Sequence, residues 1–294
     1  MKLYLVDSSI FIFKAWFAQK TATLNRAGKA NHAFIGFSDF VYQLLTEVAP
    51  QKLVFAYDDS QKKSARKSIY PEYKANRSPA PAELKQQFAW CRQWVECLGI
   101  SGVSSTAWEA DDLIGSLASL HRSDELAVVI LTADKDLTQL IHEGDLWWSF
   151  YDNKKLDYAA IRKKFGVYPA QIADQLALMG DKVDNIPGIP RVGQKTAANL
   201  LRKFGTLQNL RDNLDQVSKM KFRYAGLVAK SLIDNESILD ISARLTPINC
   251  QLREVIKIPI ERSTIQHDSL LQMMDDQSMD SPRRLKWESY LNRV

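Results

Sequence analysis

The sequence lacks the features that mark several classes of protein. It has only three cysteines and four histidines in 294 residues, with no C-x-x-C pair and no close pair of histidines. These counts fit neither a disulfide framework nor a zinc site. No apolar run reaches the roughly 18 residues of a membrane helix, since the longest dense run is Leu126 to Leu131. We therefore do not expect an integral membrane protein.

The chain also lacks a stretch of biased composition and a secretion signal. The first apolar run ends at Asp7, too early for a signal peptide, so a cytoplasmic location is expected. With 46% apolar and 25% charged residues, the composition is that of an ordinary globular protein. The length is enough for one large domain or two modest ones.

Basic residues are concentrated in two parts of the chain. Gln61 to Ala89 contains seven basic residues against two acidic ones, and Lys182 to Lys230 contains ten against three. Because the net charge of the whole chain is only +5, the remaining residues are acidic overall. Two solvated surfaces would explain such blocks, and so would a polyanionic partner such as nucleic acid.

The N-terminal half alternates between strand and helix patterns. Three short apolar runs are typical of strands buried on both faces: Leu3–Val6, Leu53–Tyr57 and Ala127–Leu131. Helical spacing separates them, at Phe34–Val48, Glu83–Leu98 and Ala107–Leu120, the last opened by a capping-box pattern from Thr106 to Glu109. This alternation predicts an α/β fold with a parallel sheet flanked by helices.

The rest of the chain divides by pattern as well. We expect an α/β catalytic domain over residues 1–160, a mostly helical DNA-binding region over 161–250, and a tail over 251–294 without an assignable role. A basic connection with three prolines, Ser60 to Pro81, is too long for an ordinary loop. Loops of this length are usually functional or disordered.

Acidic residues follow each predicted strand. Asp7, Asp58, and the pair Asp134 and Asp136 stand at or just after strand ends, which meet at one edge of a parallel sheet. More acids stand at the start of the third predicted helix and within a later Gly-Asp-Lys-Val-Asp-Asn segment: Glu109, Asp111, Asp112, Asp181 and Asp184. Taken singly, each is explained by a helix cap or dipole. Together they would repel one another unless cations intervene, and oxygen-only sites select Mg²⁺ or Mn²⁺. Two such ions can activate water against a phosphodiester.

A glycine-rich turn, from Ile186 to Ala197, resembles a phosphate-binding P-loop but fails its spacing. Gln194 separates Gly193 from Lys195, and no strand precedes the turn. A nucleotide-hydrolysing site is therefore not expected. The turn instead predicts a helix-hairpin-helix contact to the DNA backbone at about residues 180–205. The residues placed at this contact are Gly188, Arg191, Gly193, Gln194, Lys195 and Thr196.

Six motifs together resemble one known family. They are LYLVDSSIFIFKAWFA, LVFAYD, YPEYKANR, WEADDLIGSLA, LTADKDLTQL and LMGDKVDNIPGIPRVGQKTAANLL. In this order they resemble the 5′ nuclease family, which comprises the 5′-3′ exonuclease domain of bacterial DNA polymerase I and its free-standing relatives, the flap endonucleases. The resemblance extends over roughly Met1 to Ala243. It implies a PIN-like core, a helical arch at about residues 60–90, and a helix-three-turn-helix element.

The resemblance also implies a set of site residues. One metal ion would be held by Asp7, Asp58, Glu109, Asp111 and Asp112, and a second by Asp134, Asp136, Asp181 and Asp184. The arch motif places Lys74 and Arg77 at the scissile phosphate, assisted by Arg66 and by Lys14, which stands where an arginine is common. A potassium ion would be bound by backbone carbonyls near Val183, Ile186 and Val192. Arg191 stands where the family usually has glycine, so a side-chain contact to phosphate is expected there.

These residues predict a metal-dependent 5′-3′ exonuclease or flap endonuclease. It would act as a monomer on 5′ flaps, nicked or gapped duplexes and primer-template junctions, in primer removal and repair. The alternative is a DNA-junction binding protein of the same fold with weak or no catalysis. A PIN-domain ribonuclease is a second rival, disfavoured by the long arch and the hairpin.

Overall fold

A six-stranded sheet forms the centre of the fold. The computed structural model describes residues 1–18, 23–58 and 64–294. The strand order is β3-β2-β1-β4-β5-β6, and all neighbours are parallel except the β5–β6 pair. The strands are β1 (Lys2–Asp7), β2 (Lys52–Asp58), β3 (Ser101–Ser105), β4 (Ala127–Leu131), β5 (Leu146–Ser149) and β6 (Lys154–Leu156). The three predicted strands are confirmed as β1, β2 and β4, whereas β3, β5 and β6 were missed.

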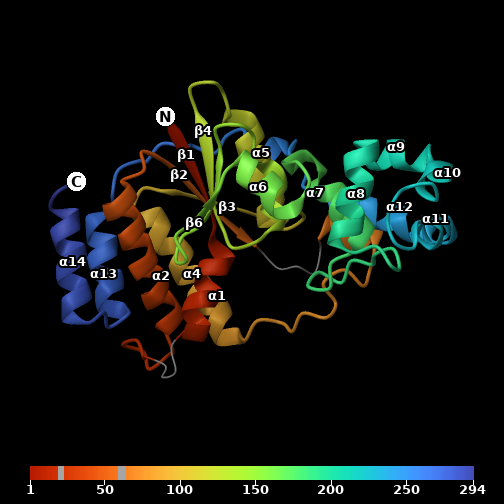
Figure 1. Cartoon of the computed structure of the whole chain (residues 1–294). Helices are drawn as coiled ribbons and strands as arrows, with labels where there is room; N and C mark the ends of the chain where they lie inside the picture. Colours follow the sequence, from red (N-terminus) through yellow and green to blue (C-terminus); the bar gives the residue numbers. More distant parts are fainter. Residues whose placement is uncertain (19–22, 59–63) are drawn as a thin grey trace.

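Helices cover both faces of the sheet (Figure 1). Because side chains alternate along a strand, Leu3 and Leu5 of β1 join one apolar cluster while Val6 joins the other. The Leu3 side is covered by α5 (Ala110–His121) and α6 (Tyr158–Phe165). The Val6 side is covered by α1 (Ser8–Ala18), α2 (His32–Gln43), α4 (Ala82–Cys97), α13 (His267–Asp276) and α14 (Ser281–Leu291). The predicted α/β class is therefore confirmed.

Two predicted helix boundaries differ from the structure. The predicted Phe34–Val48 helix is α2 followed by a π-helical turn over Leu44–Val48. The predicted capping box at Thr106 is wrong, because α5 begins at Ala110 and its N-cap is Glu109. Asp112 accepts a hydrogen bond from the Glu109 N–H at 3.2 Å, so the box lies three residues later.

The C-terminal residues, which had no predicted role, are part of the core. Helices α13 and α14 pack against the layer formed by α2 and α4. Trp287 is 1% exposed, and its ring meets those of Trp94 and Tyr42 edge to face, with centroids 4.9 and 5.3 Å apart. Aromatic burial of this extent contributes several kcal/mol to folding.

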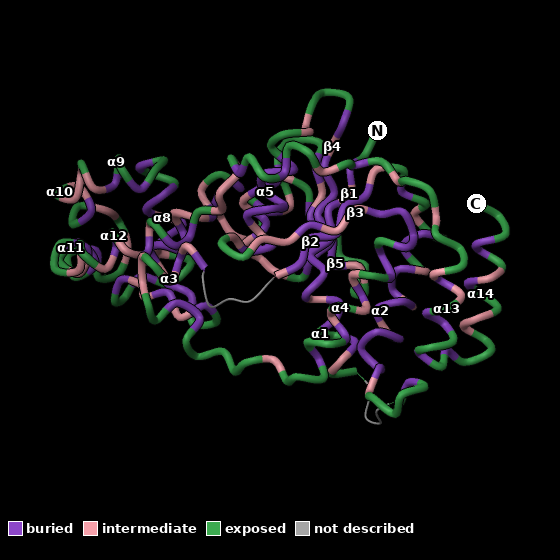
Figure 2. Tube along the Cα trace, turned by 180° about the vertical axis from the view of Figure 1, so that it is seen from behind, coloured by how far each residue is buried: buried purple, intermediate pink, exposed green. Residues whose placement is uncertain are grey.

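Residues 161–250 are mostly helical, as predicted. They contain α7 (Ile172–Met179), α8 (Gln194–Phe204), α9 (Leu207–Arg211), α10 (Leu214–Val217), α11 (Ala225–Asp234) and α12 (Glu236–Leu245). Figure 2 shows α8 to α12 to one side of the sheet, and one apolar cluster runs continuously from α5 into this region. No described helix is both long and apolar enough to cross a membrane.

The predicted arch is helical over only part of its length. Helix α3 (Ala65–Ile69) lies against α12, the chain then turns over residues 70–77, and an extended stretch leads to α4. Figures 1 and 2 both show this connection running from the helical region back to the sheet. The part of the predicted arch at residues 60–63 lies outside the described residues.

Candidate active site

Carboxylates gather at the edge of the sheet where the parallel strands end. Asp7 closes β1 and accepts a hydrogen bond at 2.9 Å from the Thr132 hydroxyl, just after β4. Asp58 closes β2 and accepts one at 2.9 Å from the Ala110 N–H, which fixes the start of α5. Strand ends and the α5 N-terminus therefore meet at one place, as the sequence predicted.

Burial and mutual repulsion favour the neutral forms of four acids in this cluster. Burial, reinforced by the charge of Asp58, raises the pKa of Asp7 to about 8. Burial, reinforced by Asp134, raises the pKa of Asp136 to about 7. The pKa values of Asp111 and Asp134 are raised as well, first by burial and then by carboxylates. Such repulsion marks a site built to receive cations.

The arch residues reach into this cluster. Lys74 is buried, and its ammonium lies 2.8 Å from Glu109 Oε2 and 3.5 Å from Asp184 Oδ2. Arg77 forms an ion pair with Asp184, and the Tyr73 hydroxyl lies 3.0 Å from Glu109 Oε2 and 3.2 Å from Asp184 Oδ2. Although Glu109 is buried, Lys74 and then Arg66 keep its pKa below the usual value. The basic arch and the acidic sheet edge thus form one site.

Asp181 and Asp184 enter the site on a tight loop after α7. The Asp181 and Ile186 backbones pair through two hydrogen bonds of 2.9 and 2.7 Å. This loop closes because Gly180 and Gly188 approach each other, and a Cβ on Gly188 would lie 2.3 Å from the Met179 oxygen. Gly180 also has a φ of +73°, which favours glycine.

A cleft of about 330 Å³ opens between this loop and the end of β4. It is lined by Ile10, Ala133, Asp134, Lys135, Asp136, Asp181, Val183 and Asp184. Asp136 presents a buried Oδ1 with no hydrogen-bond partner among the described residues, while Lys135 pairs with Asp181 at 2.7 Å. The four acids predicted for a second metal ion therefore line one cleft.

The donor set fits hard divalent cations. It consists of carboxylate oxygens, which repel one another without countercharge. Within the part of the chain that the structure describes, Oδ1 of Asp136 has no hydrogen-bond partner. Among residues 1–18, 23–58 and 64–294, no three acidic, histidine or cysteine side chains are arranged to hold an ion as they stand. Lys74, Arg77 and Lys135 supply the countercharge in this arrangement.

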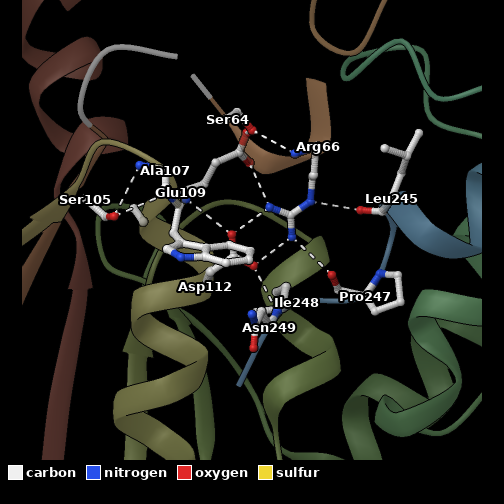
Figure 3. Close-up of polar contacts among 12 residues, drawn as sticks. Ser64, Arg66, Ser105, Ala107, Glu109, Asp112, Leu245, Pro247, Ile248 and Asn249 are labelled. Carbon is white, nitrogen blue, oxygen red and sulfur yellow. Dashed lines mark hydrogen bonds and ion pairs between the residues drawn. The ribbon is translucent and has the colours of Figure 1, made fainter. Parts of the chain in front are cut away.

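Three predicted site residues make other contacts. Arg66 and Asp112 bind each other through two hydrogen bonds, and Arg66 approaches Glu109 only at 3.5 Å (Figure 3). The exposed Lys14 lies over the ring of Tyr151, with its ammonium 4.2 Å from the centroid. Tyr73, Thr132 and Lys135 were not predicted as site residues, although all three lie inside the motifs that resemble the 5′ nuclease family. The only sequence signal for these three residues is that they stand close to predicted site residues in the same motifs.

The predicted hairpin joins α7 to α8. Gly193 is the N-cap of α8, and Gln194 and Lys195 of its first turn are exposed, with Thr196 partly so. The free N–H groups of that turn suit a phosphate. Of the three residues predicted to coordinate potassium through their carbonyls, Ile186 already accepts the Asp181 N–H. Val183 is exposed and Val192 is buried.

Replacing Arg191 with glycine is expected to stabilise the protein and weaken DNA binding. Arg191 has a φ of +70°, a conformation that costs a non-glycine residue on the order of 1 kcal/mol. Thermal unfolding should show a gain of about this size. Loss of one phosphate contact should lower the slope of log Kd against log salt by about 1. An unchanged slope would show that Arg191 does not contact DNA.

The comparisons with known proteins agree with this architecture. Residues 2–166 match the family model of the 5′-3′ exonuclease N-terminal resolvase-like domain, and residues 167–269 match that of the 5′-3′ exonuclease C-terminal SAM fold. A 5′-3′ exonuclease of Buchnera aphidicola is 33% identical, with 86% of this chain and 90% of the relative aligned. A 5′-3′ exonuclease of Aquifex aeolicus is 36% identical, with 74% of each aligned.

Longer and more distant proteins share the fold. The DNA polymerase I of Bacillus caldotenax is 31% identical over 97% of this chain, which spans 33% of that polymerase. T5 5′-exonuclease, solved with zinc, superimposes with a TM-score of 0.68 at 18% identity, covering 94% of this chain and 100% of that one. The catalytic core of Rad2 bound to DNA gives 0.63 at 18% identity, covering 100% and 92%. The chain therefore belongs to the 5′-3′ exonuclease family and is a nuclease of that family.

Proposed function

We propose that this nuclease hydrolyses DNA phosphodiesters near 5′ ends and at junctions between single strand and duplex. Its substrates are 5′ flaps, nicked or gapped duplexes and primer-template junctions, which suits a monomer acting in primer removal and repair in the cytoplasm. One observation carries the proposal. Acids from two strand ends, the α5 N-terminus and the loop after α7 gather around one buried arch lysine, Lys74.

Two Mg²⁺ or Mn²⁺ ions suit the carboxylate set. Asp7, Asp58, Asp111 and Glu109 would hold one, and Asp134, Asp136, Asp181 and Asp184 the other. Burial and neighbouring carboxylates raise the pKa values of Asp7, Asp111 and Asp136, and bound cations would relieve this repulsion. When bound, such ions activate water and stabilise the charge of the reacting phosphodiester. The bound ions would then neutralise the acids, and the ion pairs with Lys74 and Arg77 would no longer be needed for this.

Released from the carboxylates, Lys74 and Arg77 are free to bind the scissile phosphate. Lys74 approaches from the arch with a φ of +53°, and its N–H donates to the Asp184 carbonyl at 2.9 Å, so its backbone is tied to the cleft. Its ammonium therefore stays close to the cluster even when its ion pairs break. A charged donor held in this way favours the developing charge of the transition state.

The hairpin would hold the duplex while the arch handles the single strand. The α8 N-terminus and the side chains of Arg191 and Lys195 suit the backbone phosphates of one strand, without reading sequence. A K⁺ ion bound by hairpin carbonyls, including those of Val183 and Val192, would strengthen this contact. Backbone contacts of this kind explain recognition of DNA form rather than base order.

A titration on labelled substrates tests the proposal. Cleavage of a 5′ flap is measured with EDTA, Mg²⁺, Mn²⁺ and K⁺ varied in turn, beside single-stranded RNA and unbranched duplex. We expect metal-dependent cleavage close to the flap junction, no cleavage in EDTA, and a K⁺ effect on Kd rather than on the cleavage rate. Tight flap binding without cleavage in either metal would instead identify a junction-binding protein.

A further inference from the structure

Arg66 and Asp112 form a buried pair beside the carboxylate cluster (Figure 3). The two terminal guanidinium nitrogens of Arg66 donate to the two oxygens of Asp112, at 2.7 and 2.8 Å. Asp112 is 0% exposed and Arg66 is 8% exposed. A bidentate pair fixes orientation as well as distance. Exposing either side chain to solvent would therefore break both hydrogen bonds of the pair.

The pair uses its remaining hydrogen-bonding capacity on the backbone. Asp112 Oδ1 accepts the Asn249 N–H at 2.9 Å, and Oδ2 accepts the Glu109 N–H at 3.2 Å. With the two bonds from Arg66, all four acceptor positions of the carboxylate are filled. Arg66 Nε donates to the Leu245 carbonyl at 2.9 Å, and Nη2 to the Pro247 carbonyl at 3.1 Å. A metal ion or a phosphate would have to break this network to bind here.

The network joins segments that are far apart in the sequence. Arg66 belongs to α3 at the base of the arch, Asp112 to the first turn of α5, and Leu245 to the end of α12. Helix α12 is in turn tied to the hairpin, because the Ser242 hydroxyl donates to the Pro187 carbonyl at 2.6 Å. A short chain of contacts therefore leads from the DNA-binding hairpin to α5.

Glu109 lies where these segments meet. Its Oε1 accepts from the Ser64 hydroxyl at 3.3 Å, and its Oε2 lies 2.8 Å from the Lys74 ammonium. Arg66 Nη1 stands 3.5 Å from the same Oε2. Arg66 thus touches Glu109 more weakly than Asp112, and holds α3 so that Ser64 and Lys74 reach Glu109.

We propose that Arg66 and Asp112 are positioning residues and not ligands of metal or phosphate. Their pair fastens the arch base and the end of α12 to α5, and so sets both the orientation of Glu109 and the distance from hairpin to carboxylates. This inference rests on the proposed function: if the hairpin holds the duplex, the distance from the hairpin to the carboxylates decides which phosphodiester reaches the cluster. Arg66 and Asp112 therefore determine the position of the cut.

Two conservative variants and a matched control test the proposal. Asp112→Asn keeps the shape but not the charge, Arg66→Lys keeps the charge but not the two-pronged geometry, and the double variant combines them. Asp111→Asn is the control, since Asp111 is the neighbouring acid inside the cluster. Circular dichroism checks that each variant folds. If Asp112→Asn does not fold, Arg66→Lys, which retains one ammonium donor, is used to test the pair.

Binding of Mn²⁺ without DNA, followed by the EPR signal of the free ion, gives a readout independent of cleavage. We expect Asp112→Asn and Arg66→Lys to bind as many ions as the wild type, with affinities lowered by a similar factor of about ten or less. The double variant should match the weaker single variant within about threefold, because each change already breaks the pair. Asp111→Asn should lose one ion. Loss of an ion in Asp112→Asn but not in Arg66→Lys would overturn the proposal.

Cleavage of a 5′-labelled flap gives the second readout. Both variants should spread the cuts over neighbouring phosphodiesters and lower kcat about tenfold. A single unchanged cut position in both would overturn the positioning role, as would effects that multiply in the double variant. If the wild type binds Mn²⁺ but cuts no substrate, the proposed function fails, while the Mn²⁺ measurements still decide whether the pair holds an ion.

Discussion

Replacing Lys74 with methionine is expected to lower the cleavage rate about 10³-fold. Methionine keeps the length of the side chain but removes the charge that lies 2.8 Å from Glu109 and 3.5 Å from Asp184. Lys74 is only 8% exposed, and its ammonium lies closer to Glu109 than the Arg66 guanidinium does, at 2.8 against 3.5 Å, so solvent cannot replace this charge in the transition state. The measurement is the single-turnover rate on a flap at saturating Mg²⁺, with Kd for the same flap determined separately.

Lys85 provides the matched control for this experiment. It belongs to the same basic segment but is exposed in the first turns of α4. Lys85→Met should change association by a few-fold at most and leave the single-turnover rate unaltered. Equal losses in the two variants would mean that the segment acts only by general attraction of DNA.

The parts of the fold that were predictable are those with strong local patterns. Strands β1, β2 and β4 are continuous apolar runs because they lie in the middle of a sheet covered on both faces. Strand β3, with the sequence SGVSS, lies at the edge and is mostly half-buried, so its residues carry little apolar signal. The role of Trp287 depends on packing against α2 and α4, which are remote in sequence.

The site was predictable where position along a strand decides it. Asp7 and Asp58 meet because parallel strands end at one edge, which follows from the pattern alone. Arg66 could not be distinguished from a phosphate-binding arginine, since its partners Asp112 and Leu245 are contributed by other parts of the chain. A basic segment indicates charge, but only the fold shows which cation is buried against which acid.

Replacing Asp7 with asparagine is expected to abolish cleavage and stabilise the metal-free protein. Asp7 is 4% exposed, and its pKa of about 8 reflects burial and the charge of Asp58. Between the unfolded value, near 4, and about 8, the folded state holds a proton that the unfolded state has released. The free energy of unfolding therefore falls as pH rises through this window, by up to about 1.4 kcal/mol per pH unit for one proton. Asp136, with a pKa of about 7, contributes in the same direction.

The variant should separate stability from activity. In EDTA at pH 8, Asp7→Asn should unfold at a higher temperature than the wild type, and its stability should depend less on pH, because one repelled carboxylate is gone. Mg²⁺ should stabilise the wild type more than the variant, whose cleavage rate should fall at least about 10³-fold. Asp145→Asn is the control: Asp145 is equally buried, but its carboxylate is 2.8 Å from the Arg122 Nε, away from the cluster. Removing that paired charge should destabilise the protein while leaving cleavage intact. A destabilised Asp7→Asn variant in EDTA would show that its carboxylate is not held among like charges, and the metal assignment would lose its physical basis.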